Sequence, residues 1–306
     1  MKIKKYSEWK DTALIIHQIS QMIGKTMLEH MEPQPQWNNV LLKLTSDGFS
    51  SELITFEEKS FQIDISLRDS KVIMSRVDGK KVSFNLHGKK SISEYYFEFH
   101  NLLEEMECKK AIYTVPQEMS ITIPFEENHE KLNYDSDDAL MFHDMCVFTY
   151  NAQTEFIAKY RAKKILPSFF WGTFDMTTAI FNGVADPFSG GSIIEKVAFD
   201  EQMIEFGFWP GDDNVDEPTF FILSYPFAPA DLSDSNIEPG KAYYGTAKSE
   251  FFITLEDILS YDNPKQALCD FYQSGFEILA KHFNWPNMEW INKPLLNLKG
   301  SEAFRK

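Results

Sequence analysis

The chain is poor in several features by which protein functions are commonly recognised. It has only three cysteines, Cys108, Cys146 and Cys269, which lie far apart and form no CxxC pair. This spacing argues against a disulfide framework or a zinc knuckle and fits reduced thiols in a cytoplasm. No stretch approaches the roughly 18 consecutive apolar residues of a membrane-spanning helix. The basic start MKIKKYSEW leads into no apolar segment. We therefore expect a soluble cytoplasmic protein without a membrane partner.

Positive charge is also scarce. The sequence holds 30 Lys and Arg residues against 46 Asp and Glu residues, which gives a net charge of −16. Because proteins bind nucleic acids mostly by neutralising phosphates with Lys and Arg, this balance predicts no nucleic-acid partner. It disfavours adsorption to anionic lipid for the same reason. The oligomeric state cannot be read from the charge or the composition.

The common catalytic and cofactor motifs are missing. The sequence contains no GxGxxG or GxxxxGK[ST] segment, which argues against a dinucleotide or nucleotide cofactor. It has no GxSxG nucleophile elbow. Its seven histidines form no HxH, HxxxH or HExxH pattern, and the acidic runs DSDD and GDDNVDE lack the spacing of a calcium loop. We predict neither a metal site nor a cofactor.

Aromatic residues, by contrast, are abundant. The chain of 306 residues has 27 Phe, 12 Tyr and 6 Trp. Each buried aromatic ring removes a large apolar area from water, so a substantial core is expected. The length fits one large domain or two packed domains.

Two consecutive parts of the chain show the same order of predicted elements. Residues 1–130 begin with an amphipathic helix, continue with alternating strands that include a hairpin at Asp78-Gly79, and end with a helix capped by Ser91 and Glu94. Such a run of strands between helices predicts an α+β fold with antiparallel β-sheets and helices packed on one face.

Residues 131–306 repeat this order with longer insertions. A helix is predicted over about 136–162, several strands follow, and a last helix begins at Asn263 and Pro264. The insertions, at about 184–200 and 228–248, are rich in Gly, Pro, Asp and Ser. We expect the two parts to pack as one compact unit. Internal duplication of a helix–strands–helix unit is a hypothesis, because the two parts share few identical residues.

A candidate pocket is suggested by the stretch PSFFWGTFDM, which is predicted to lie in one strand over 169–181. In such a strand Phe170, Phe174, Met176 and Ile180 would form an apolar row. Trp171, Thr173 and Asp175 would alternate on the other face with Thr177. An apolar wall with a few polar groups is typical of a small-molecule site. Trp209, in the later cluster EFGFWPGDD, and the hydroxyl of Tyr225 are further candidate ligand-binding residues.

Asp175 is the best candidate for a functional carboxylate, because aromatic surroundings should raise its pKa. In the alternative interpretation it is a structural residue that turn amides or Lys25 satisfy. Its role as a catalytic acid or base is a weaker hypothesis, since no partner group can be identified by spacing.

Several segments, WKDTALIIHQISQMIGK, FFWGTFDMTTAIFNG, GFWPG, YPFAP and EFFITLEDI, together resemble an uncharacterised bacterial family, domain of unknown function 5996. The resemblance runs over nearly the whole chain and implies a soluble bacterial protein, but no activity. The residues that match the family pattern are His17, Lys25, Trp37, Trp171, Asp175 and Trp209. His17 and Lys25 therefore join the candidate ligand-binding residues, although a lone histidine on a helix is more often structural.

The chain also departs from the family pattern. Relatives commonly carry a histidine where this chain has Ser168, and a His-Glu pair where it has Glu201 and Gln202. If those histidines bind a metal or move protons in relatives, this chain lacks them.

Three functions stay open at this point. The first is a small-molecule-binding protein with an aromatic-lined pocket. The second is a hydrolase or lyase that uses Asp175 as general acid or base. The third is a protein-interaction module with exposed aromatic residues. Whether the protein is an enzyme is undecided.

Overall fold

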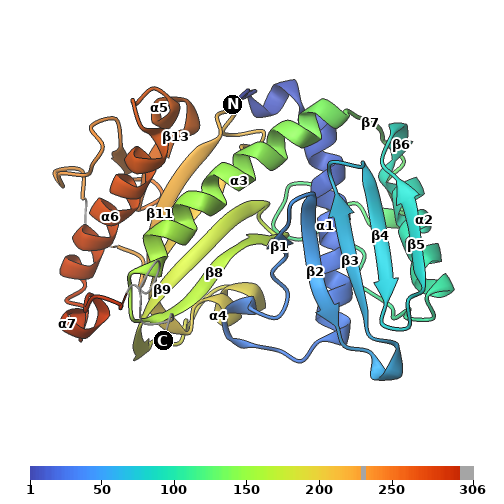
Figure 1. Cartoon of the computed structure of the whole chain (residues 1–306), viewed down its shortest axis with the longest axis horizontal. Coiled ribbons are helices and arrows are strands. Elements are labelled where there is room, and N and C mark those ends of the chain that lie inside the picture. The colour runs from blue at the N-terminus through green and yellow to red at the C-terminus, as the bar shows by residue number, and fades with distance from the viewer. Residues whose placement is uncertain (229–231, 297–306) are drawn as a thin grey trace, which may run out of the picture.

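A computed structural model of the chain describes residues 1–228 and 232–296. Two large antiparallel sheets lie beside each other, with helices packed against them (Figure 1). A small third sheet pairs β6 (Gly88–Ser91) with β7 (Lys131–Tyr134). The prediction of an α+β fold with antiparallel sheets is confirmed.

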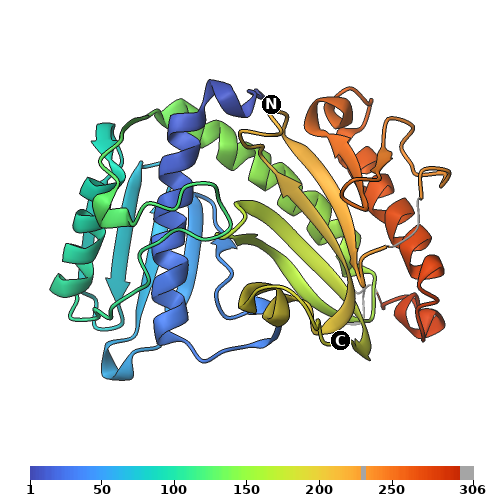
Figure 2. The same ribbon diagram turned by 180° about the vertical axis from the view of Figure 1, so that it is seen from behind.

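The first half forms a five-stranded sheet in which each strand pairs with the next along the chain. Its strands are β1 (Lys43–Leu44), β2 (Gly48–Ile54), β3 (Phe61–Ser66), β4 (Lys71–Arg76) and β5 (Lys81–Asn85). Two helices, α1 (Lys10–His30) and α2 (Ile92–Glu105), lie on one side of it (Figure 2). Short 3-10 turns are η1 (Tyr6–Glu8), η2 (Pro35–Trp37), η3 (Glu57–Lys59) and η4 (Phe125–Glu127).

Local signals in this half are confirmed. The Asp78-Gly79 turn joins β4 to β5, and Gly79 has a φ of +93°, which a residue with a Cβ rarely adopts. Ser91 caps α2, because its hydroxyl accepts a bond from the Glu94 amide while the Glu94 carboxylate accepts one from the Ser91 amide.

The second half forms a six-stranded sheet in the order β12-β13-β11-β10-β9-β8. These strands are β8 (Lys163–Phe170), β9 (Asp175–Ala185), β10 (Glu201–Trp209), β11 (Thr219–Tyr225), β12 (Tyr243–Gly245) and β13 (Glu250–Thr254). The helices of this half are α3 (Ser136–Ala158), α4 (Ile193–Ala198), α5 (Leu255–Leu259), α6 (Pro264–His282) and α7 (Met288–Ile291). The predicted cap of the last helix is confirmed: Asn263 caps α6 and Pro264 is its first residue.

One face of the six-stranded sheet is covered by α3 and α6 (Figure 1). Phe206 of β10 shows how: its ring centroid lies 4.7 Å from that of Phe156 on α3 and 5.6 Å from that of Tyr272 on α6. The opposite face looks toward the viewer in Figure 2, with α4 across one end.

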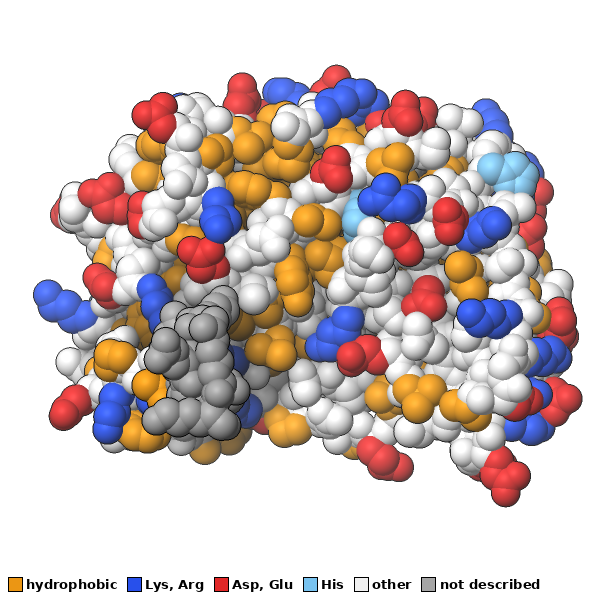
Figure 3. Space-filling model, in the orientation of Figure 1, with side chains coloured by type: hydrophobic (Ala, Val, Ile, Leu, Met, Phe, Trp, Pro, Cys, Tyr) orange, Lys and Arg blue, Asp and Glu red, His pale blue; other side chains and the backbone are white. Residues whose placement is uncertain are grey.

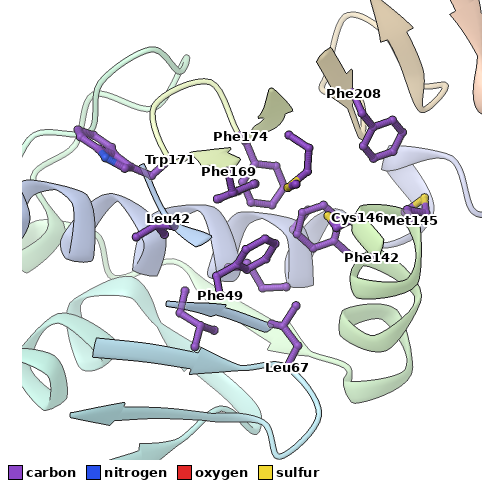
Figure 4. Close-up of a cluster of buried hydrophobic side chains, with 14 of the residues drawn as sticks. Leu42, Phe49, Leu67, Phe142, Met145, Cys146, Phe169, Trp171, Phe174 and Phe208 are labelled. Atoms are coloured by element: carbon purple, nitrogen blue, oxygen red, sulfur yellow. The ribbon is translucent and has the colours of Figure 1, made fainter. Parts of the chain in front are cut away.

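The two large sheets meet at an isolated bridge between Leu42 and Phe169, whose backbones exchange hydrogen bonds of 2.9 and 2.8 Å. Aromatic rings fill the space around this junction (Figure 4). The ring of Phe49 stacks on Phe169 with centroids 4.4 Å apart, and Phe142 of α3 stacks on Phe174 at 5.0 Å. The core is therefore continuous between the halves.

The prediction of one strand over 169–181 is wrong. β8 ends at Phe170, and the chain turns back through 171–174 so that Phe170 pairs with Asp175 at the start of β9. Phe174 has a φ of +64°, outside strand geometry. Because the alternation of sides restarts after the turn, the two predicted rows do not exist as such.

The helix predicted to reach 162 ends at Ala158. The insertion predicted at 228–248 and the YPFAP segment include positions among 229–231, which lie outside the described residues, as do 297–306 of the second half. In the described residues both halves place strands between an opening and a closing helix, and duplication stays a hypothesis.

Candidate functional site

A cavity of about 1250 Å³ lies on the face of the six-stranded sheet opposite α3 and α6. We call it the sheet cavity. The strands form its floor, while its walls come from α1, η2, α4 and the loop 118–121. First-half and second-half elements thus enclose it together.

The floor follows from the strand register. Residues two apart on a strand point to the same face, and antiparallel pairing aligns them into rows across the sheet. One row runs Ile165, Ala179, Glu205 and Leu223, from β8 to β11. The pairing of β11 with β13 ends at Ile222 and Phe251, and continuing it by one residue places Glu250 beside Leu223 in this row. All five line the cavity.

The next row holds Thr177, Gly207, Phe221 and Phe252. A Cβ on Gly207 would lie only 1.9 Å from the ring of Phe221, so the ring lies over the glycine. Gly207 therefore allows an aromatic ring to lie low on the floor, which a larger residue would prevent.

Side chains of η2 hold the cavity wall together through hydrogen bonds. The indole of Trp37 donates a hydrogen bond of 3.0 Å to the Ile194 carbonyl of α4, and the Gln36 amide donates to the Asp200 carboxylate. These bonds join a first-half turn to α4, which borders the cavity, and to Asp200 shortly after α4.

Asp175 lies at the start of β9 and is only 5% exposed. It lines the cavity, and the Thr173 hydroxyl donates a hydrogen bond to its carboxylate. Burial is the main cause that raises its pKa, to about 8, and the nearby charge of Glu205 acts in the same direction. The carboxyl of Asp175 is therefore mostly protonated at neutral pH.

Two further carboxyls on the floor were not predicted from the sequence. Glu205 accepts a hydrogen bond from the Thr177 hydroxyl, and burial raises its pKa. Burial likewise raises the pKa of Glu250 to about 7; the charge of Glu205 adds to this, and Lys248 opposes it. The available signal was a glutamate at an inward position of each apolar strand, in MIEFGFW and EFFITL.

None of these three carboxyls forms a salt bridge with any residue in 1–228 or 232–296. In particular, the Lys25 amine does not satisfy Asp175. It bonds to the Gln117 side-chain oxygen at 3.0 Å instead. The Thr173 hydroxyl and the backbone amide of Asp175 itself bond to the Asp175 carboxyl instead.

His17 of α1 lines the cavity but is tied to the protein. Its Nε2 donates to the Gly172 carbonyl at 3.0 Å, and its ring stacks on Phe174 with centroids 4.6 Å apart. Burial lowers its pKa to about 4, so the imidazole is neutral at physiological pH. It presents a flat, uncharged surface to the cavity.

Trp171 and Lys25 lie together and do not line the cavity. The Trp171 indole packs on Gly24 and donates to the Val40 carbonyl at 3.1 Å. The Lys25 amine lies 5.9 Å from the Trp171 ring and 5.0 Å from that of Tyr113. Lys25 is 2% exposed, and burial lowers its pKa to about 8.

The other predicted residues lie in two places, the sheet cavity and an aromatic cluster beside it. Thr173 and the half-buried Trp209 line the sheet cavity with Asp175. Tyr225 lies in a neighbouring aromatic cluster, where its hydroxyl donates to the Asp186 carbonyl at 2.7 Å and its ring centroid lies 5.2 Å from that of Phe199. The structure thus brings together His17, Thr173, Asp175 and Trp209.

The positions Ser168, Glu201 and Gln202, where the family resemblance leads us to expect histidines or a His-Glu pair in relatives, hold structural bonds in this chain. The buried Ser168 hydroxyl accepts from Lys43 at 3.0 Å. Glu201 pairs with Lys163 at 2.6 Å, and Gln202 donates to the Asp186 carboxylate at 3.1 Å. Across 1–228 and 232–296, His, Cys, Asp and Glu form no group of three that could hold a metal ion. No helix in the same residues is long and apolar enough to cross a membrane.

A model of a family of unknown function, DUF5996, matches residues 3–291. The chain belongs to this family. The DUF5996 match covers both large sheets and every wall of the sheet cavity. No curated protein and no solved structure matches the chain.

Proposed function

We propose that the protein binds a small organic molecule in the sheet cavity. The observation that supports this most is a concave site with aromatic surfaces and a few carboxyl and hydroxyl groups on its floor. This combination is the usual composition of small-molecule sites, in which apolar contact supplies affinity and polar groups fix orientation.

A ligand screen with a blocked cavity tests the proposal. Ligand-observed NMR with a library of metabolites and fragments is run on the wild type and on Ala179→Phe, which adds a ring to the cavity floor. Ala111→Phe places the same ring at an exposed position and serves as the control. We expect hits that bind wild type and the control but not Ala179→Phe. A wild type without hits, or hits that survive the blocked floor, would contradict the proposal.

A hydrolase or lyase is the second candidate, because Asp175 and Glu205 line one cavity and influence each other's protonation. In a pair of carboxyls, the protonated one can donate a proton to a leaving group, and the ionised one can accept a proton from water. Broad activity screening of wild type, Asp175→Asn and Glu205→Gln tests this candidate. An activity that both amide variants retain would exclude these carboxyls as acid and base.

The interaction-module alternative stays a prediction. The exposed aromatic residues include Phe97 on α2, Trp290 on α7 and Tyr113 in the segment between α2 and η4. Acidic and basic side chains are interspersed on the face shown in Figure 3. A cytoplasmic location is likewise proposed, on the ground that all three cysteines are free.

A further inference from the structure

The carboxyls of the floor are spaced in a way that suits a particular class of ligand. Glu205 and Glu250 belong to the same row and are separated by one strand, β11, on which Leu223 lies between them. With strands about 4.8 Å apart, their backbones are roughly 10 Å apart. Their side chains rise from the same face on either side of an apolar residue.

The ionisable side chains around this row are almost all acidic. Eight of the residues lining the cavity are Asp or Glu, and only Lys10 and Lys248 carry positive charge. Lys10 forms an ion pair with Asp213 at 2.5 Å, which leaves Lys248 near Glu250. The remaining carboxylates on the walls are Glu118, Glu130, Glu195 and Asp212. An anionic ligand would be repelled by such a site.

Aromatic rings lie beside the same row. Phe221 and Phe252 occupy the next row of the floor, and Trp209 lies one row beyond. Ring faces attract cations and also accommodate a hydrocarbon chain. A site that joins carboxylates to ring faces favours an organic cation over a neutral polyol, since a polyol would leave the carboxylates without a counter-charge.

We propose that the sheet cavity binds an organic amine, preferentially a diamine whose two ammonium groups meet Glu205 and Glu250 and whose carbon chain crosses Leu223 and Phe221. This inference rests on the proposed small-molecule function and names its ligand class. Binding releases protons from the floor to solvent, because the ammonium groups favour ionisation of Glu250 and of Asp175, and the Asp175 carboxyl is mostly protonated in the free protein. The neutral His17 on the α1 wall makes no charged contribution.

Calorimetry with a matched series of compounds tests the inference. The probes are α,ω-diaminoalkanes of three to eight carbons, the monoamines of the same lengths and the corresponding diols. We expect diamines of intermediate length to bind tightest, monoamines at least about tenfold more weakly, and diols not at all. Titrations in phosphate and in Tris at pH 7 measure proton exchange, and we expect net proton release.

The variants Glu205→Gln and Glu250→Gln remove one carboxylate each while preserving shape. Each should weaken diamine binding at least about tenfold and bring it to the level of the monoamine. Glu32→Gln, at an exposed position outside the cavity, should bind as wild type does. Circular dichroism confirms that each variant is folded before it is titrated.

The possible outcomes separate the two proposals. Neutral or anionic compounds could bind wild type but not Ala179→Phe, while the amines do not bind at all. That result would overturn the amine inference and leave the small-molecule function standing. If neither the amine series nor the metabolite library binds, both are overturned. Diamine affinity that is unchanged in both Gln variants also overturns the amine inference.

Discussion

Asp175→Asn should make the protein more stable, and more so as the pH rises. In the folded chain burial and Glu205 raise the pKa of Asp175 from 3.8 to about 8. The folded state therefore keeps a proton that the unfolded state releases above about pH 4. The sign follows from this difference: wild-type stability falls as the pH rises from about 4 to about 8. Asparagine has nearly the shape of the protonated acid and cannot ionise.

The magnitude follows from the size of that shift. Integrating the linkage relation for one group with these two pKa values gives a loss of less than about 2 kcal/mol at pH 5 and on the order of 4 kcal/mol at pH 7. The Asn variant should thus match wild type at pH 4 and exceed it by about 2–4 kcal/mol at pH 7. The lower bound allows for Glu205 adjusting its own protonation when its neighbour is replaced.

Urea unfolding followed by circular dichroism, at half-unit steps between pH 4 and pH 8, measures the difference in unfolding free energy. Asp78→Asn is the matched control. Asp78 is exposed, and its hydrogen bonds with Arg76 lower its pKa to about 2. Because a pKa lowered from 3.8 to about 2 titrates below about pH 4, its replacement should reduce stability by a nearly constant amount across this pH range. A difference between Asp175→Asn and wild type that does not change with pH would refute the reasoning.

Three further predictions concern the frame of the site. Gly24→Ala places a Cβ about 2.0 Å from the Trp171 ring and should lower the unfolding free energy in urea by about 1–3 kcal/mol. The control Gly240→Ala places a Cβ that meets no atom within 4 Å and should change the unfolding free energy by less than about 0.5 kcal/mol. Equal effects of the two substitutions would contradict the packing argument. Ser91→Ala removes a helix cap and should cost about 1 kcal/mol in the same assay, and an unchanged midpoint would count against it. In an NMR titration of the imidazole signals, His17 should show a midpoint near 4, because burial lowers its pKa; a midpoint near 6.5 would show that the ring is solvated.

The sequence was sufficient for the elements whose signals are local. The Asp78-Gly79 hairpin, the Ser91 cap and the Pro264 helix start each depend on residues within a few positions of one another. The α+β class followed from the order of these elements. Nothing outside each segment was needed to predict them.

The error in 169–181 came from a periodic pattern that continues through a turn. Phe170 and Phe174 fall on even positions and Trp171 and Thr173 on odd ones, which matches the two faces of a strand, and Gly172 reads equally well as a gap between side chains. The tertiary contact that decides the matter is remote in sequence: Trp171 packs on Gly24 of α1. Local periodicity cannot report such a contact.

The sequence predicted only some of the residues that line the sheet cavity. The others were missed because the contacts that join them are also remote in sequence. Asp175 stood out because aromatic neighbours surround it in the sequence. Glu205 and Glu250 join Asp175 in one cavity only when β9, β10, β11 and β13 pair in register. The register joins residues that are 30 to 75 positions from Asp175, and no spacing rule covers that distance.

The bridge between Leu42 and Phe169 has a consequence for how the chain can be divided. A fragment that starts near residue 131 would retain the floor of the sheet cavity but would lose His17 and Trp37 from its walls. It would also expose the edge of β8 where Leu42 now pairs. The cavity is therefore a property of the two halves in contact. A compound held there touches both, so its binding energy also resists their separation, and ligand affinity and cohesion of the halves should rise or fall together.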